Sequence, residues 1–434
     1  MLKRVTALSL AAILSVSLFT ACGTTSGSGT ESTSAQDGGL TGEITFSLNR
    51  SEEELATLYQ PIADRFMEEN PGTSITFVVH ETDAQVARTQ LNAGEFADIS
   101  IAPRDITPSD LSRFYLSLGS TEELSQKYQY AGLLAYDGQA YGLPSGVTHS
   151  GMLYNKEVID TYLNGEVPKT LDAWYDACAT LKENGITPVW TNAGSLWPMS
   201  EWDNIAIEIS GDPGYRNSLK DVEEPWAEGT PLFQEATIFQ TLIENDWVEE
   251  DTVMDQWDAS RKGMANGEIG FMILGSWAVP QLKDVAETMG LDPENIGFAP
   301  VPYKNDVSAE NPLNVLLAED MIFAINKNTE YPDLSKAFLE YFLASEGPSL
   351  MGLSSPIIGG EKAEWVKEFE TMDYVKEMEK DLPDADMTEK CNEMQLDVFM
   401  GGTYLITHVL EPLKNGQQPT LNDLNQLWSE NFGE

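Results

Sequence analysis

The chain has 434 residues, which exceeds the roughly 250–300 residues at which a single hydrophobic core stops growing, so at least two lobes are expected. Hydrophobic residues make up 41% and charged residues 22%, as in a globular protein rather than a disordered one. A formal net charge of −45 repels phosphate backbones and therefore argues against nucleic acid as a partner.

The first residues have the pattern of an export signal. Lys3 and Arg4 precede an apolar stretch at 5–19, which is shorter than the roughly 20 apolar residues of a membrane span. The following "LFTACG" resembles a bacterial lipobox, in which the cysteine becomes the acylated first residue of the mature protein. We expect residues 1–21 to be a lipoprotein signal peptide and Cys22 to carry the lipid, palmitate included; an ordinary secretory signal is the alternative.

A polar segment follows this cysteine. Between Gly23 and Gly39 the one apolar side chain is that of Ala35, so the stretch cannot repay the entropy of ordering. Residues 22–41 are therefore expected to form a flexible tether. An anchor followed by a tether places the folded part outside the cytoplasm, on the outer face of the bacterial cell membrane.

The residues after the tether alternate between strand and helix patterns. Residues 42–48 ("GEITFSL") alternate apolar and polar positions, and residues 51–72 show helical periodicity that ends at Asn-Pro-Gly. A strand at 73–80, a helix at 83–94 and a strand at 97–102 continue the pattern. This order predicts a mostly parallel sheet with helices on both faces, an α/β fold.

The rest of the chain repeats these patterns less regularly. A helix is expected from Thr170, a turn and strand at 184–190, a strand at 321–328 and a long amphipathic helix at 331–347. No repeat of fixed length is visible, which excludes solenoids and propellers. Cys178 falls at a helical apolar position, so a buried free thiol is expected, with a disulfide to Cys391 as the alternative.

No catalytic or metal-binding motif is visible. The three histidines are far apart in sequence, and there is no nucleophile elbow, phosphate-binding loop, dinucleotide fingerprint, Cys-x-x-Cys pair or paired-histidine pattern. We therefore expect no enzymatic activity, no cofactor and no metal. A carboxylate pair of the glycosidase type could still lie among the 70 acidic residues, because such enzymes need only two acids at a set separation.

The tryptophans point to a ligand. Residues 189–204 place Trp190, Trp197 and Trp202 among amide, hydroxyl and carboxylate groups, Asp203 included. A carbohydrate site has this composition, because the apolar face of a pyranose lies on aromatic rings while its hydroxyls pair with polar side chains. The alternative is that one or two of these tryptophans close the core.

A second candidate position is Trp277 in "FMILGSW". The apolar run predicts a buried strand, Gly275 a tight turn, and Ser276 the N-cap of the next helix. Trp277 would then stand at a strand-to-helix corner, where α/β folds bind ligands. We expect its ring to stack on the ligand, with a core role as the alternative.

The chain resembles the family 1 extracellular solute-binding proteins, the sugar-capturing lipoproteins of bacterial ABC importers. The stretches that carry the resemblance are "ADRFMEENPGTSITF", "LNAGEFADIS", "YGLPSG", "LYNKEVI", "TLDAWYDACATLKENGITP", "KGMANGEIGFMILGSW", "IGFAPVPY" and "MIFAINKNTEYPDLSKAFLEYF". The resemblance implies the type II periplasmic-binding-protein-like fold, in which two α/β lobes are joined by hinge strands around a ligand cleft.

The resemblance also implies where the lobes divide. The expected crossings lie near 145–150, 317–320 and 344–347. The expected N-terminal lobe is 42–147 plus 318–346, and the expected C-terminal lobe is 148–317 plus 347–434.

Further candidate ligand contacts follow by position in the family. Asn49 and Arg50 follow the first strand, Asp105 lies in the loop after the third, and His149 lies in a hinge segment. The alternatives are a surface cation for Arg50, a helix cap for Asp105 and a structural hinge histidine for His149. Trp197, Trp202, Asp203 and Trp277 complete the expected set.

The implied function is capture of a mono- or short oligosaccharide and its delivery to an ABC transporter permease by hinge closure. We expect a lipid-anchored monomer without a cofactor. The alternatives are a binder of a non-sugar solute, such as an amine or peptide, and a secreted carbohydrate-active enzyme.

Overall fold

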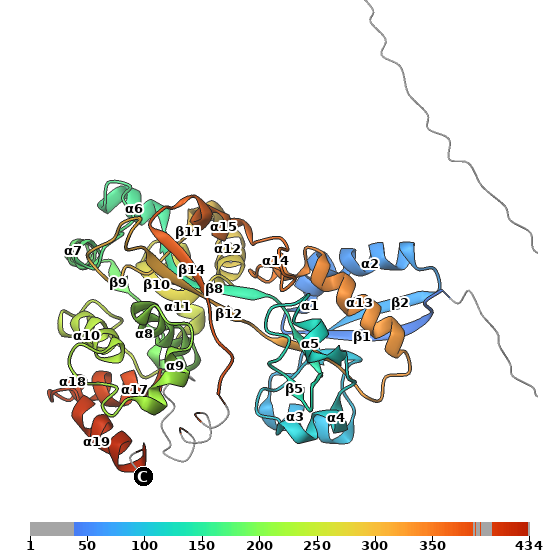
Figure 1. Ribbon diagram of the computed structural model, residues 1–434. Coiled ribbons are helices and arrows are strands. Elements are labelled where there is room, and N and C mark those ends of the chain that lie inside the picture. Colours follow the sequence, from blue (N-terminus) through green and yellow to red (C-terminus); the bar gives the residue numbers. More distant parts are fainter. Residues whose placement is uncertain (1–38, 385–386, 388–390, 392–401, 433–434) are drawn as a thin grey trace, which may run out of the picture. The chain divides into compact units, whose positions relative to one another are not determined.

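The computed structural model describes residues 39–384, 387, 391 and 402–432 (Figure 1). The predicted signal peptide, Cys22 and most of the predicted tether lie outside the described residues. No helix within the described ranges is long and apolar enough to cross a membrane.

The first sheet contains the N-terminal strands and has the order β2-β1-β3-β13-β7. Its strands are β1 (Gly42–Leu48), β2 (Thr73–Val79), β3 (Ile99–Ile101), β7 (Gly142–Pro144) and β13 (Ile322–Ile325). β1 runs parallel to β2 and β3, whereas β13 is antiparallel to β3 and β7. The strand–helix alternation read from the sequence is thus present, and its sheet is completed by a strand from much later in the chain.

Helices α2 (Gln60–Glu69) and α13 (Pro332–Ala344) cover one face of this sheet, and α3 (Ala84–Ala93) lies over the other. Phe46 of β1 packs against Phe338 and Phe342 of α13, on the face of the strand that also buries Ile44 and Leu48. Ser47, on the opposite face, is buried as well. A third, small sheet contains β4 (Gly119–Ser120), β5 (Ala135–Tyr136) and β6 (Gln139–Ala140).

The helix expected at 51–72 is divided into α1 (Glu52–Glu54), a π-helical turn at Leu55–Tyr59, and α2. Gln60 N donates to Leu55 O, one residue further back than in an α-helix. Pro61 follows at once and has no N–H to continue the regular ladder.

The second sheet has the order β14-β12-β8-β10-β9, with β11 also paired to β8. Its strands are β8 (Val147–Asn155), β9 (Thr187–Val189), β10 (Ile269–Gly275), β11 (Ile296–Ala299), β12 (Leu313–Glu319) and β14 (Val375–Glu379). β8 is antiparallel to β10, β11 and β12, whereas β14 is parallel to β12 and β9 is parallel to β10.

The helices that contact strands of this second sheet include α7 (Leu171–Glu183), α8 (Asp203–Ser210), α11 (Trp257–Ala265) and α12 (Ala278–Thr288). Helix α10 (Pro231–Glu244) packs on α8, and α19 (Leu421–Phe432) packs on the helical turn at Ile406–Leu410. The largest side chains of the associated core are Trp174, Trp202, Trp226 and Trp428, each 0–1% exposed. Cys178 is a free thiol in this core, and burial raises its pKa.

Two short connections link the sheets. β7 of the first sheet is followed at once by β8 of the second, and β12 of the second is followed by β13 of the first. The expected crossings near 145–150 and 317–320 fall at these connections. The exact lobe boundaries, including the third crossing near 344–347, stay a prediction.

Candidate functional site

The strand-to-helix corner at Trp277 is built from a buried strand. Every residue of β10 is buried, and α12 begins directly after Trp277. A Cβ on Gly275 would lie 2.6 Å from the indole of Trp277 and 2.7 Å from Thr148 Oγ1, so only glycine lets the ring lie against its own strand. The ring also packs against hydrophobic clusters of both sheets, one around Phe46 and one around Leu274.

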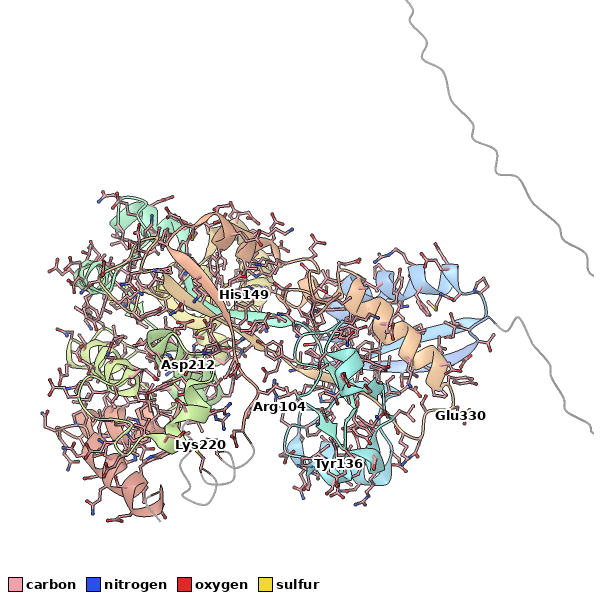
Figure 2. The ribbon with its side chains drawn as sticks, in the orientation of Figure 1. Arg104, Tyr136, His149, Asp212, Lys220 and Glu330 are labelled. Carbon is pink, nitrogen blue, oxygen red and sulfur yellow. The ribbon has the colours of Figure 1, made fainter. Side chains whose placement is uncertain are left out.

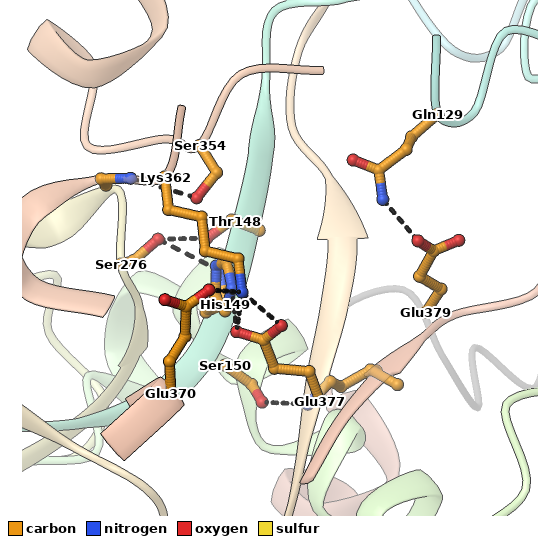
Figure 3. Close-up of polar contacts among 12 residues, drawn as sticks. Gln129, Thr148, His149, Ser150, Ser276, Ser354, Lys362, Glu370, Glu377 and Glu379 are labelled. Carbon is orange, nitrogen blue, oxygen red and sulfur yellow. Dashed lines mark hydrogen bonds and ion pairs between the residues drawn. The ribbon is translucent and has the colours of Figure 1, made fainter. Parts of the chain in front are cut away.

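Ser276 fixes this corner, although not as predicted. The N-cap of α12 is Trp277 and makes no side-chain cap, so the N-cap role expected for Ser276 is wrong. Its hydroxyl instead accepts from His149 N (3.1 Å) and donates to Gly352 O (2.9 Å), as the contacts around β8 in Figure 3 illustrate. These bonds connect β10, β8 and the loop after α14 (Gly347–Leu350), and they hold the backbone before Trp277 in place.

Three indoles from separate segments meet here; we refer to Trp197, Trp257 and Trp277 as the tryptophan cluster. The ring centroids of Trp197 lie 4.9 Å from Trp257 and 5.5 Å from Trp277, and those of Trp257 and Trp277 lie 6.1 Å apart. Trp197 is 47% exposed, and the other two are partly buried. The guanidinium of Arg261 lies 5.3 Å from the ring of Trp257 and supports it from α11.

A carboxylate joins the cluster. Trp277 Nε1 donates to Glu201 Oε1 at 2.8 Å, and Asn204 Nδ2 donates to Glu201 Oε2 at 3.1 Å. Burial raises the pKa of Glu201, while the bond from Trp277 and the charge of Lys380 lower it and Asp320 raises it. The arrangement places a hydrogen-bond acceptor next to aromatic surface.

Charged groups at the β12–β13 connection lie close to this carboxyl. Arg104, labelled in Figure 2, donates from one nitrogen to Glu319 Oε1 (2.6 Å) and from another to Asp320 O (2.5 Å). Burial raises the pKa of Asp320, and the charges of Arg104 and Arg50 oppose that rise. The charge of Asp320 also raises the pKa of Glu201. Charged residues from both sheets therefore lie near the β12–β13 connection.

Two predicted contacts follow the first strand of the N-terminal sheet, and they differ in exposure. Asn49 is exposed, and its backbone oxygen accepts from Arg50 at 2.7 Å. The side chain of Arg50 is 11% exposed and lies 3.8 Å from Glu54. Asp105 is exposed and forms an ion pair with Arg88. The charge of Arg50 opposes the rise that burial causes in the pKa of Asp320 in the β12–β13 connection. The carboxylate of Asp105, in contrast, is already paired with Arg88.

Three predicted contacts have no surface for a solute in this structure. Trp202 is 0% exposed and packs edge-on against Phe239 at 5.0 Å. Asp203 is 2% exposed, and its Oδ2 accepts from Gly402 N. His149 is 0% exposed. Each of these side chains is buried in this structure, and ligand contact by them stays a prediction.

His149 belongs to a polar cluster between β8 and β14 (Figure 3). Its Nε2 lies 3.2 Å from Glu377 Oε1, and Lys362 Nζ lies 2.6 Å from Glu377 Oε2. The hydrogen bond with His149, assisted by Lys362 and opposed by burial, lowers the pKa of Glu377 to about 2. The cluster links β8 to the edge strand β14 across β12. A structural hinge role remains the alternative to ligand contact for His149.

Sequence reasoning missed two members of the site. Glu201 lies within the polar and aromatic segment that drew attention to Trp197, so its neighbourhood was a usable signal. Trp257 reaches the cluster from the start of α11, and no pattern around it indicates a ligand site.

Two cavities lie elsewhere. One of about 710 Å³ lies between the first sheet and α3, with Ser47, His80 and Tyr115 in its lining, and another of about 850 Å³ lies beside α7. Neither lining includes a tryptophan or any predicted ligand residue. Within the described residues, no three His, Cys, Asp or Glu side chains are grouped so that they could hold a metal ion.

Comparison with protein families gives one match over most of the chain. The model of the bacterial extracellular solute-binding proteins matches residues 49–347. A curated relative, an uncharacterized ABC transporter extracellular-binding protein from Pyrococcus horikoshii, is 23% identical over 186 residues. That alignment covers 42% of this chain and 41% of the relative's length.

Comparison with solved structures gives matches over nearly the whole chain. A binding protein of an ABC transporter from Bifidobacterium animalis subsp. lactis, in complex with mannobiose, is 25% identical with a TM-score of 0.76. The same protein in complex with mannotriose is 26% identical with a TM-score of 0.75. Each match covers 91% of this chain and 95% of that structure. The fold is that of the two-lobed type II periplasmic solute-binding proteins, as expected from the sequence.

Proposed function

The chain belongs to the family of bacterial extracellular solute-binding proteins, and on this basis we propose that it binds a short oligosaccharide of the mannobiose and mannotriose class for an ABC transporter. The proposal of a sugar is supported by the Bifidobacterium relative, which was solved with these two saccharides.

The observation that carries the proposal is the tryptophan cluster with its carboxylate. A pyranose presents C–H groups on one face and hydroxyls around its rim, and it binds where aromatic surface and hydrogen-bond acceptors lie side by side. Glu201 accepts from the Trp277 N–H and stands beside the rings. Trp277 is the proposed stacking platform, Trp197 and Trp257 extend it, and Glu201 accepts a sugar hydroxyl.

The N-terminal lobe supplies the opposing contacts in this proposal. Arg50 can give two fork-like donors to sugar hydroxyls, and Asn49 is adjacent and exposed. Asp105 remains a proposed contact that would exchange Arg88 for a hydroxyl. None of these roles requires bond breaking, and we propose that the protein is a non-catalytic binder.

Delivery to the transporter would use closure about the two crossings. Segments of the N-terminal lobe already contact strands of the second sheet: Gln129 Nε2 donates to Glu379 Oε1 at 2.5 Å (Figure 3), and Tyr130 O–H donates to Leu317 O at 2.7 Å. Such contacts are of the kind that break and form in hinge closure. We further propose a monomer that lipidated Cys22 anchors to the outer face of the cell membrane.

A solute panel tests the function. The chain without residues 1–21, carrying Cys22→Ser, is mixed with mannobiose, mannotriose, raffinose, a dipeptide or a polyamine, and thermal unfolding is measured. A ligand of the folded state adds about 2.7 kcal/mol at 100 times its Kd, so a bound saccharide should raise the Tm by several degrees. A rise with the dipeptide or polyamine alone would contradict the sugar, and sugar hydrolysis in the sample would contradict a pure binder.

A further inference from the structure

An apolar ridge borders the tryptophan cluster; it consists of Leu196, Val253 and Met254. We propose that this ridge binds the third and later units of an oligosaccharide whose first units stack on Trp277, so that it sets the preferred chain length. The inference rests on the proposed function and adds a specificity-determining surface to it.

The ridge is exposed to an unusual degree. Val253 is 84% exposed, Met254 65% and Leu196 56%, and these are the three most exposed large hydrophobic side chains of the described residues. Scattered exposed apolar residues are common, but contiguous ones mark interaction sites. The three occur on two loops that touch, since a Cβ on Gly194 would lie 2.1 Å from Met254 O.

Hydrogen bonds hold the loop of Val253 and Met254 in this exposed position. One oxygen of Asp251 accepts from Val253 N (2.9 Å) and Met254 N (3.1 Å). Asp255 Oδ1 accepts from Trp257 N (3.1 Å) and from the hydroxyl of Ser195 on the facing loop. The outward direction of the side chains therefore follows from a bonded turn and does not reflect a lack of local structure.

The facing loop stores backbone strain. Leu196 has φ +64° and ψ −61°, and Asn192 has φ +57°. A residue with a Cβ in this region costs on the order of 1–3 kcal/mol, and such strain is concentrated at binding sites. The strained turn places an exposed leucine directly before Trp197 instead of burying it.

A saccharide fits the ridge better than a protein surface does, because the ridge continues the tryptophan cluster. Trp197 connects the two surfaces: it follows Leu196 of the ridge in the chain, and its ring lies 4.9 Å from Trp257 of the tryptophan cluster. Asp251 and Asp255 flank Val253 and Met254 in the chain. Oδ1 of each accepts hydrogen bonds within the loops, and Oδ2 of each can accept from a hydroxyl. Sugar units that extend from the tryptophan cluster onto the ridge would contact apolar side chains next to hydrogen-bond acceptors, as the units stacked on the rings do.

The test compares chain lengths in a ridge variant and a matched control. Binding of mannobiose, mannotriose and mannotetraose is measured by calorimetry for the unmodified protein, for the double variant Val253→Ser, Met254→Ser, and for Ile358→Ser, which removes a side chain that is 53% exposed elsewhere. We expect affinity to rise about tenfold from mannobiose to mannotetraose, a change that corresponds to about 1.4 kcal/mol.

In the double variant this rise should disappear while mannobiose binds within twofold of the unmodified protein, and Ile358→Ser should behave as the unmodified protein. An equal loss of affinity for all three sugars would overturn the inference and indicate that the ridge has a structural role only. Unchanged affinities combined with slower uptake by the transporter would also overturn it, in favour of a protein-docking surface. If the unmodified protein binds no saccharide, the proposed function itself fails, and that result is distinct from the other two.

Discussion

Two groups of tryptophans around the second sheet use the same side chain differently. Trp174, Trp202 and Trp226 are enclosed by the core, and their indole N–H groups have no hydrogen-bond partner within the described residues. Trp277 lies beside partly exposed rings, and its N–H donates to Glu201. Core tryptophans thus contribute apolar volume even at the cost of an unpaired donor, whereas the ring of the cluster is oriented by a carboxylate from another segment.

The largest expected effect is the loss of folding stability when one of the buried tryptophans is removed. Trp202→Ala should lower the free energy of unfolding by about 3–5 kcal/mol, because a large side chain leaves a cavity that the core cannot fill. Urea unfolding measures this loss. The fraction that remains folded should bind the sugar with nearly unchanged affinity, and a large affinity loss without destabilisation would place Trp202 in the ligand site instead.

The opposite pattern is expected for the cluster. Trp277→Ala should weaken saccharide binding about 100-fold, equivalent to about 2.7 kcal/mol, because the stacking platform and its link to Glu201 are both removed. The free energy of unfolding should fall by less than for Trp202→Ala, since the ring is only partly buried. Calorimetry and urea unfolding on the same samples compare the two, and a stability loss with intact binding would make Trp277 a core residue.

The core also contains a carboxyl group, that of Glu208, whereas the carboxyl of Glu201 stands at the tryptophan cluster. Glu208 is 1% exposed, accepts from Ser150 and Leu316 N, and burial raises its pKa to about 8. The unfolded carboxyl loses its proton near pH 4.5, whereas the folded one keeps it to about pH 8. Folding stability should therefore fall as pH rises between these values, by about 1.4 kcal/mol per pH unit.

Glu208→Gln removes this titration. Below pH 4.5 the variant and the unmodified protein should have similar free energies of unfolding. Between pH 5.5 and 7 the free energy of unfolding of the variant should rise by about 2 kcal/mol relative to that of the unmodified protein. Urea unfolding over this pH range measures the difference. A constant difference across the range would mean that Glu208 is ionised in the folded protein.

The sequence predicted the fold well because strands and amphipathic helices are local patterns. The strand at 42–48 and the corner at Trp277 appear where the periodicity placed them. The helix at 51–72 was interrupted, since Pro61 acts on the hydrogen-bond ladder and not on the apolar pattern. The strand order of both sheets was not predicted, because it depends on pairing between residues far apart in sequence, for which no local pattern gives a signal. The two-lobed fold itself was expected from the family resemblance.

The site was predicted less completely, because exposure is set by tertiary packing. Trp197 and Trp202 lie in one short segment, yet the turn at Leu196 and the 3₁₀-helix at Trp197–Glu201 leave one ring at the surface and the other in the core. Composition could not separate them. Trp257 was missed for the same reason, since only the packing of α11 against α12 brings it to the cluster.

A crystal structure with mannotriose tests the central claim most directly. The account predicts sugar rings within van der Waals distance of Trp277 and Trp197, with a hydroxyl donating to Glu201 and with Arg50 on the opposite side. A saccharide bound in the 710 Å³ cavity beneath α3, with the tryptophan cluster unoccupied, would contradict it.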